Sequence, residues 1–220
     1  MNIKLTGPID RTAWLAALHA KGEAQERLAA DLEEGERLLK AAARPKAVYK
    51  TMKASDILMP DTLHDSVKSI SLEKHLAGCH SAALMAVTLG VEVDELIRRT
   101  QVTDMALAVI IDTGASVMVE QLADECEKYI EGSYRTSRFS PGYGDWPITE
   151  QARLLRYLDA GKAIGLTATR DSLMIPRKSI TAVIGISDRP VSGRLATCDE
   201  CVLKDKCELK KEGKYCGSKL

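Results

Sequence analysis

Four of the six cysteines lie close together near the C-terminal end of the chain. Cys198, Cys201, Cys207 and Cys216 follow the spacing CxxC-x5-C-x8-C. A CxxC pair holds two thiolates on one turn, and the wider intervals let two more return to the same centre. Four thiolates suit zinc or an iron–sulfur cluster, and the spacing alone leaves both open. The pattern therefore predicts a short cysteine-rich metal-binding tail over residues 196–220.

The remaining cysteines are predicted to be structural. Cys79 is followed by His80, but neighbouring side chains of a strand point to opposite faces, so this pair does not suit a nucleophile and its base. Cys126 falls on a long predicted helix and is interpreted as a small buried hydrophobic residue. Three further histidines lack the spacing of metal ligands and are expected to be exposed or hydrogen-bonded: His19, His64 and His75.

A second candidate site is the loop over residues 138–147, Arg-Phe-Ser-Pro-Gly-Tyr-Gly-Asp-Trp-Pro. Five of the nine aromatic residues fall between Tyr129 and Trp146, in a stretch otherwise rich in glycine and proline. Prolines stiffen such a loop, glycines let its backbone approach a ligand, and aromatic faces with an arginine suit a flat heterocycle or a carboxylate. The alternative is a loop that packs its rings into a small satellite core.

The composition excludes several classes of partner. The chain has 220 residues, with 31 Lys+Arg and 31 Asp+Glu interspersed along it. This balance argues against duplex nucleic acid or an anionic membrane as a partner. The start lacks the apolar core of a signal peptide, and no stretch has the roughly 18 uncharged apolar residues of a membrane span. We therefore expect a cytoplasmic protein, in which clustered cysteines favour metal or redox chemistry over disulfides.

These candidate sites need elements to position them, and helices dominate the first part of the chain. Residues 1–45 are predicted to form an N-terminal helical segment, in which Asp10 caps a first helix and Pro45 ends a second. Thr103 and Thr149 are predicted caps of later helices, and Gly114 is expected to mark close packing or a local break. Further elements are expected in this order: a strand over 47–52, a loop over 55–66, a helix over 71–78, a buried strand over 81–90, helices over 91–100 and 103–131, a loop over 132–147 and a helix over 149–161.

The last third of the chain is predicted to be β. Short runs over 164–168 and 172–175 precede a clean alternation over 179–187, with Ile180 and Ile184 on one face. Helices and strands are partly segregated, and the final strands are closely spaced. We therefore predict an α+β fold, with an antiparallel (mixed) sheet packed against helices. A Rossmann-type methyltransferase is excluded because no glycine-rich turn follows an early strand.

The ordered motifs resemble a known family. Residues 138–143, Arg-x-Ser-Pro-Gly-Tyr, followed by Pro147 and a helix, look like the Arg-x-x-Pro-Gly-Tyr motif of the activation (reactivation) domain of cobalamin-dependent methionine synthase. Residues 165–186 are similar to that family's Gly-x-x-Leu-Thr-x-Ser-x-x-Met-x-Pro-x-x-Ser-Val-Ser-Gly segment. Residues 76–79, 89–90 and 112–120 resemble its free-standing short forms. The resemblance covers residues 45–190, and the combination is more specific than any one motif.

The resemblance implies a set of residues that bind S-adenosylmethionine. Arg138 is expected to pair with the methionine carboxylate, and the Ser140 backbone to contact the ligand. Tyr143 is expected at the methyl-donor end. Glu120 resembles the acidic residue that holds the amino group, with Asp124 as the alternative register. The remaining cofactor-binding residues of the motif are Pro141 and Gly142.

The resemblance also implies a function and a domain organisation. An activation-like domain over 46–195 is expected between the helical segment, 1–45, and the cysteine tail. It would support reductive methylation of cob(II)alamin on a separate corrinoid protein or cobalamin-dependent methyltransferase, with an external electron donor such as a flavodoxin or ferredoxin. Short relatives often carry such a cysteine tail, and this resemblance favours a 4Fe-4S cluster in the tail of this chain, with zinc as the alternative. The competing interpretation is a non-catalytic corrinoid-protein docking module with a structural zinc tail.

Overall fold

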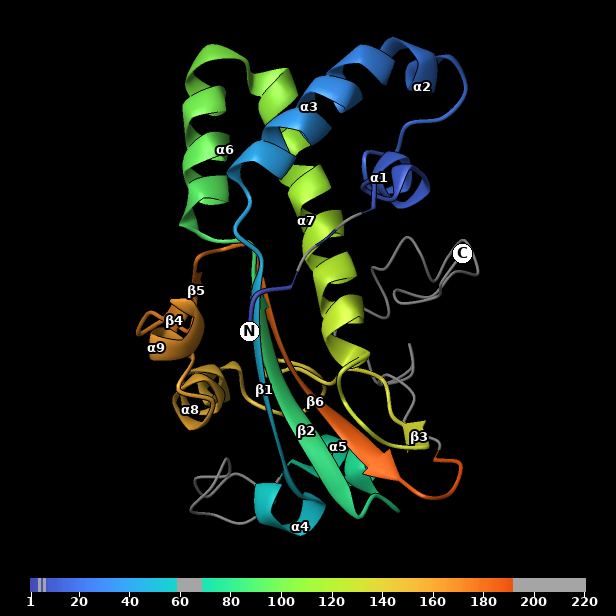
Figure 1. The fold of residues 1–220 in the computed structure, drawn as a ribbon, viewed down its shortest axis with the longest axis vertical. Helices are drawn as coiled ribbons and strands as arrows, with labels where there is room; N and C mark the ends of the chain where they lie inside the picture. The colour runs from blue at the N-terminus through green and yellow to red at the C-terminus, as the bar shows by residue number, and fades with distance from the viewer. Residues whose placement is uncertain (4, 6, 59–68, 192–220) are drawn as a thin grey trace. The chain divides into compact units, whose positions relative to one another are not determined.

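Three long strands and one short strand form the main sheet of the protein (Figure 1). The structure is a computed structural model that describes residues 1–3, 5, 7–58 and 69–191. The strands lie in the order β1-β2-β6-β3. Their bounds are Lys46–Lys53 for β1, Ser81–Thr88 for β2, Tyr134–Arg135 for β3 and Ser179–Ser187 for β6.

Hydrogen bonds at the strand ends show that the sheet is antiparallel. Arg44 donates its backbone N–H to Leu89, while Ala54 donates to His80, so rising numbers on β1 face falling numbers on β2. Between β2 and β6, Leu89 donates to Lys178 and His80 donates to Ile186, with the same reversal. The pair β3–β6 is antiparallel as well. The predicted α+β class with an antiparallel sheet is confirmed.

The chain divides into two compact units, and each is described by itself. The first unit consists of residues 1–48, 86–130 and 159–180, and the second of residues 49–85, 131–158 and 181–220. Each of the long strands β1, β2 and β6 contributes residues to both units.

In the first unit, three helices pack against a long central one, and a fourth packs against one of these three. The central helix is α7, Met105–Glu127, which contacts α1, α3 and α6 (Figure 1). The bounds of the others are Arg11–Ala17 for α1, Glu23–Arg27 for α2, Ala29–Ala42 for α3 and Val91–Thr103 for α6. The same unit contains α9, Ala160–Ile164, and a two-stranded sheet of β4, Thr167–Ala168, and β5, Met174–Ile175.

Trp14 fills the centre of this helical core. Its side chain is fully buried, and its indole Nε1 donates a 3.0 Å hydrogen bond to the carbonyl of Ile110. Gly114 of α7 faces the ring so closely that a Cβ there would lie 2.5 Å from Trp14 Cε2. The helix continues through Gly114 without interruption. Of the two outcomes expected at this glycine, the structure therefore shows close packing.

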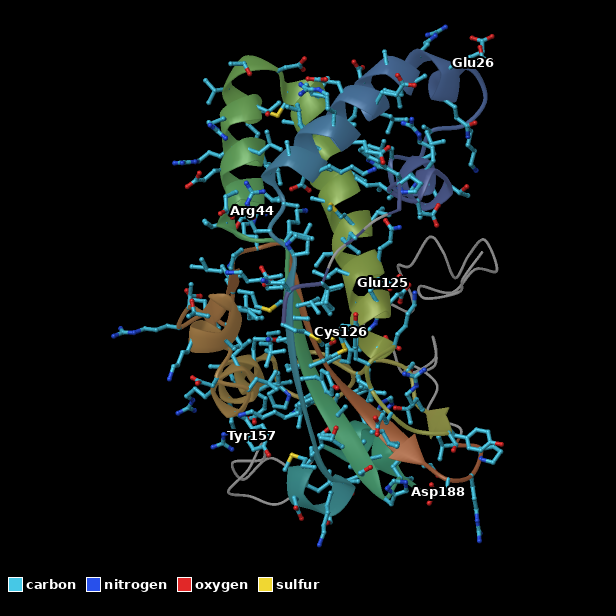
Figure 2. All side chains as sticks on the ribbon, in the orientation of Figure 1. Glu26, Arg44, Glu125, Cys126, Tyr157 and Asp188 are labelled. Carbon is cyan, nitrogen blue, oxygen red and sulfur yellow. The ribbon has the colours of Figure 1, made fainter. Side chains whose placement is uncertain are left out.

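Among the described residues, α7 is long and apolar enough to meet the criterion for a membrane span by length and composition. Its buried residues, which include Ile111, Leu122 and Cys126, form part of the first unit's core. A helix in the core of a folded unit meets the same criterion. Figure 2 shows Cys126 near the C-terminal end of α7, and its complete burial confirms the structural role predicted for it.

In the second unit, short helices lie beside the strands. They are α4, Ala54–Ile57; α5, Ile70–Leu76; the 3-10 helix η1, Ile148–Glu150; and α8, Gln151–Tyr157. The helix α5 packs onto β6, because a Cβ at Gly185 would lie 3.3 Å from Leu76 Cδ2 and 2.5 Å from Cys79 Sγ. This glycine therefore allows the close approach of the two segments.

Several sequence predictions are correct and others are wrong. Asp10 caps α1 as predicted, since its carboxylate accepts from the N–H groups of Thr12 and Ala13. The cap of α7 is Asp104 and not Thr103, because the extended backbone at Asp104 separates α6 from α7 and its carboxylate accepts from Leu107. Sequence periodicity places such a break only to within a few residues.

The region after residue 147 also differs from prediction. Thr149 is not a cap, because it lies inside η1, which runs directly into α8. The predicted helix over 149–161 ends at Tyr157, and a separate helix, α9, ends at Gly165, whose φ is +74°. Most of the strand predicted over 164–168 is therefore helix end and turn. The strand β3 lies inside the segment that was predicted to be loop.

Candidate functional site

The predicted ligand loop begins as a continuation of the β3–β6 ladder in the second unit. In the antiparallel register of β3 and β6, Tyr134 lies opposite Ser187 and Arg135 lies opposite Ile186. Thr136 then donates its backbone N–H to Gly185, but the next pair is Phe139 opposite Val183. The loop strand therefore uses one more residue than β6 across this interval, which defines a β-bulge.

Arg138 lies in this bulge. Thr136 closes one side of it, since its Oγ1 accepts a 2.7 Å hydrogen bond from the backbone N–H of Gly185. Phe139 closes the other side with two ladder bonds to Val183 of 2.9 and 2.8 Å. Bulges redirect a side chain away from the regular alternation of a strand. The guanidinium of Arg138 is thus carried by a short segment that is hydrogen-bonded on both sides.

Two consecutive turns shape the loop after the bulge. In the first, Tyr143 donates its N–H to the carbonyl of Ser140, with Pro141 and Gly142 at the centre. Gly142 has φ +93°, and proline followed by a glycine of positive φ is the pattern of a type II turn. In the second, Trp146 donates to the carbonyl of Tyr143. Tyr143 thus lies where the turns join, and its side chain is 44% exposed.

Aromatic side chains of this loop form a compact cluster with His75 of α5. Phe139 is buried between His75, at a centroid distance of 4.8 Å, and Trp146, at 6.0 Å. Tyr143 meets the Phe139 ring edge-on at 5.8 Å. Such offset and edge-on pairs stabilise beyond their buried area. Phe139 and Trp146 therefore form a satellite core, which was the alternative interpretation of these aromatic residues, and Tyr143 lies exposed at its edge.

His75 of α5 is the titratable member of this cluster. Only 4% of it is exposed, and its Nε2 lies 2.8 Å from Thr136 Oγ1 in a hydrogen bond. Burial lowers the pKa of His75 to about 4, although hydrogen bonds with the backbone of Ser137 and Val183 act in the opposite direction. The imidazole is therefore neutral at neutral pH. It matches the expectation of a hydrogen-bonded histidine.

The C-terminal end of the loop is joined to the first turn of α5 through Asp145. Its carboxylate accepts hydrogen bonds from Ser69 Oγ at 2.6 Å, from the N–H of Ile70 at 2.8 Å and from the N–H of Ser71 at 3.0 Å. Burial alone would raise the pKa of Asp145, but these hydrogen bonds lower it to about 2. Gly144 approaches the same turn, since a Cβ there would lie 2.7 Å from Ser71 Cβ.

Glu120 lies on α7 in the first unit, on an exposed face of that helix. It belongs to a polar stripe with the i, i+4 spacing Asp112, Ser116, Glu120 and Asp124, which all occupy one side of an otherwise apolar helix. Lys178 occupies the beginning of the stripe, with Nζ 3.0 Å from Asp112 Oδ2 and 2.9 Å from Ser116 Oγ. Glu120 and Asp124 are one turn apart on the same face, so both remain candidates for the acidic contact.

The structure thus brings together five of the predicted residues, in one loop of the second unit: Arg138, Ser140, Pro141, Gly142 and Tyr143. Ser140 is further held by a 2.7 Å hydrogen bond from its Oγ to the carbonyl of Thr181. Cys198, Cys201, Cys207 and Cys216 lie outside the described residues. Among the described residues, no group of three or more His, Cys, Asp or Glu side chains could hold a metal ion.

Sequence reasoning missed Asp145 and underestimated His75. Asp145 stands in the sequence Gly-Tyr-Gly-Asp, where an aspartate is an ordinary turn residue. Its partner Ser69 is 76 positions away. The only local signal for the contact is that Ser69 also caps α5, since its Oγ accepts from the N–H of Leu72.

Comparisons with known proteins agree with this fold. Residues 62–192, more than half of the chain, match the model of the family described as vitamin B12 dependent methionine synthase, activation domain. A crystal structure of the MetH reactivation domain bound to AdoHcy has the same fold, with a TM-score of 0.60 and 17% sequence identity over 94% of this chain and 82% of that chain. No curated protein sequence matches the chain. The chain therefore belongs to the activation-domain family of vitamin B12-dependent methionine synthase.

Proposed function

We propose that this protein binds S-adenosylmethionine through the loop over 138–143 and so supports reactivation of a separate cobalamin-dependent methyltransferase. The observation that carries the proposal is the β-bulge at Arg138, whose flanking backbone is hydrogen-bonded on both sides, in the same loop as the exposed Tyr143. A guanidinium pairs with carboxylate in a two-pronged geometry, which suits the methionine end of the ligand. The solved MetH domain of the same fold is bound to AdoHcy, the product of methyl donation.

The acidic contact with the ligand is proposed from the family resemblance. An ammonium group favours a carboxylate, and Glu120 is proposed to hold the amino group of the ligand, with Asp124 one turn further along as the other candidate. The positions of Pro141 and Gly142 let the backbone at Ser140 approach a ligand without a bulky side chain between them.

The corrinoid is proposed to belong to a partner protein. One electron reduces cob(II)alamin to cob(I)alamin, which then takes the methyl group from the sulfonium and leaves S-adenosylhomocysteine. The four tail cysteines are proposed to hold a 4Fe-4S cluster, because a tetrathiolate set suits a one-electron carrier and the reduction needs one electron. A flavodoxin or ferredoxin would be the external source. We propose a cytoplasmic location, because reduced electron donors are available there.

Ligand titration tests the methyl-donor proposal. Calorimetry with S-adenosylhomocysteine should give binding by wild type and at least a tenfold higher Kd for Arg138→Ala, since a lost charged hydrogen-bond pair costs about 1.5–3 kcal/mol. Arg170→Ala, at an exposed turn of the first unit, serves as the matched control and should leave Kd unchanged. Absence of binding to wild type, or equal Kd values for the two variants, contradicts the proposal.

A matched pair of variants resolves the acidic contact. Glu120→Gln and Asp124→Asn each remove one charge from the same face of α7 while keeping the side chain's size. Only the residue that holds the ligand's ammonium should raise Kd, by about tenfold. If neither variant changes Kd, the stripe is not part of the site.

A second candidate function is a non-catalytic docking module with a structural zinc tail. It is favoured by two exposed large side chains, Tyr143 of the loop at 44% and Ile148 shortly after the loop at 49%. Metal analysis after anaerobic purification separates the two functions. Brown protein with iron and sulfide supports the reductive function, whereas colourless protein with one zinc supports docking.

A further inference from the structure

We propose that Asp145 is a positioning residue of the ligand loop, which holds Tyr143 in its binding arrangement through the first turn of α5. The inference rests on the proposed binding of S-adenosylmethionine to this loop. Asp145 would hold the loop in its binding arrangement without touching the ligand itself.

The loop divides into two halves that are anchored differently. The half around Arg138 belongs to the β-ladder, through the bonds between Phe139 and Val183 and between Thr136 and Gly185. The half around Tyr143 is outside the ladder. Its backbone is closed on itself by the bonds from Tyr143 to Ser140, from Gly142 to Trp146 and from Trp146 to Tyr143.

Asp145 is the polar link between this second half and α5, and Ser140 Oγ separately bonds the carbonyl of Thr181. Three donors of α5 and its cap converge on its carboxylate: Ser69 Oγ, Ile70 N and Ser71 N. The two N–H groups belong to the first turn of a helix, where no intrahelical partner exists, so a carboxylate satisfies them. Asp145 returns its own N–H toward Ser71 Oγ at 3.4 Å. Hydrogen bonds to a charged acceptor are among the stronger ones in proteins.

Steric fit at Gly144 is a second, independent observation. Its φ is +55°, and a Cβ would lie 2.7 Å from Ser71 Cβ. The loop thus approaches α5 as closely as backbone atoms permit. Gly144 is the neighbour of Asp145 in the chain. The steric contact of Gly144 and the hydrogen bonds of Asp145 therefore hold the same part of the loop against α5.

Loss of the link should weaken binding without changing the ligand's contacts. Apparent affinity falls in proportion to the fraction of molecules whose loop is in the binding arrangement. If Asp145→Ala leaves that arrangement populated in about one molecule in ten, Kd rises about tenfold. Asp145→Asn keeps one acceptor but faces the N–H of Ile70 or Ser71 with an amide, so its effect should be intermediate.

The test combines affinity with amide hydrogen exchange. We expect Asp145→Ala to raise the Kd for S-adenosylhomocysteine about tenfold and Asp145→Asn about threefold. Exchange at Gly142, Tyr143 and Trp146 should accelerate, whereas Phe139 and Val183 in the ladder should stay protected. A general loss of stability would accelerate both sets. Asp188→Asn is the matched control, because Asp188 is an exposed aspartate of the same unit (Figure 2).

Each outcome has a defined meaning. If wild type does not bind S-adenosylhomocysteine, the proposed function fails. If wild type binds and Asp145→Ala binds equally well, the function stands and the positioning role is overturned. Gly144→Ala gives an independent check, since it disturbs the same contact with Ser71 and should raise Kd in the same direction. An unchanged Kd in Gly144→Ala also overturns the proposal.

Discussion

Acid should destabilise the second unit through His75. The imidazole is nearly enclosed between Phe139 and Thr136, and burial lowers its pKa from 6.5 to about 4. In the unfolded chain the ring is hydrated and titrates near its ordinary value. Between pH 6.5 and about pH 4, His75 of the unfolded chain binds a proton that His75 of the folded protein does not. The free energy of unfolding therefore falls as pH falls through this window, and above it His75 contributes no pH dependence.

The magnitude follows from the two pKa values. The complete change, from 6.5 to about 4, corresponds to about 3 kcal/mol of unfolding free energy, of which about 2 kcal/mol is lost between about pH 7 and about pH 5. Asp145 titrates in a different window. Its pKa is lowered from 3.8 to about 2, so its contribution is present above 3.8 and lost only as pH falls toward 2.

Urea denaturation at several pH values measures the effect, with His75→Phe as the comparison. Phenylalanine keeps a ring to stack on Phe139 but carries no titratable group. Wild type should lose about 2 kcal/mol more than His75→Phe between about pH 7 and about pH 5, because all other titrating groups are common to both. Equal pH dependence in the two proteins would falsify the assignment of a buried, neutral His75.

Three glycines provide tests of packing. Gly114→Ala places a Cβ 2.5 Å from Trp14 Cε2 and should lower the free energy of unfolding by about 2 kcal/mol. Gly35→Ala, whose Cβ would have its nearest neighbours at 3.4 Å, should be neutral or stabilise by up to about 1 kcal/mol. Equal effects of the two variants in denaturant titrations would show that Trp14 is not tightly enclosed. Gly185→Ala should cost about 2 kcal/mol because its Cβ would lie 2.5 Å from Cys79 Sγ, and Cys79→Ala in the same chain should recover part of that loss. A double variant no more stable than Gly185→Ala would contradict this packing.

Much of the fold could be predicted because its signals are local. The alternation over 179–187 predicted β6, and Asp10 predicted the start of α1, since strand period and helix caps involve only neighbouring residues. The cap of α7 was misplaced by one residue, since it is Asp104, and the end of α6 was placed at residue 100 although that helix continues to Thr103. The two-residue strand β3 could not be predicted, because it has no period of its own and exists only by pairing with β6.

The candidate site shows the same division. Pro141 and Gly142 predict a turn from their own backbone preferences, and the structure contains one. The ordered motifs, of which the one around Arg138 is a part, predicted the family, and the family is confirmed. Its place in a bulge was not predictable, because a bulge is a mismatch between two segments and is absent from either sequence alone.

The sequence by itself determined where the chain turns, which faces of its long helices and strands are apolar, and which family its motifs belong to. Tertiary structure alone decided that His75 lies beneath Phe139, and that Asp145 meets the first turn of α5 across 76 positions. The physical reason is the range of the interactions. Backbone preference and side-chain period act between neighbouring residues, whereas strand register, buried rings and shared hydrogen bonds depend on partners that only folding brings together.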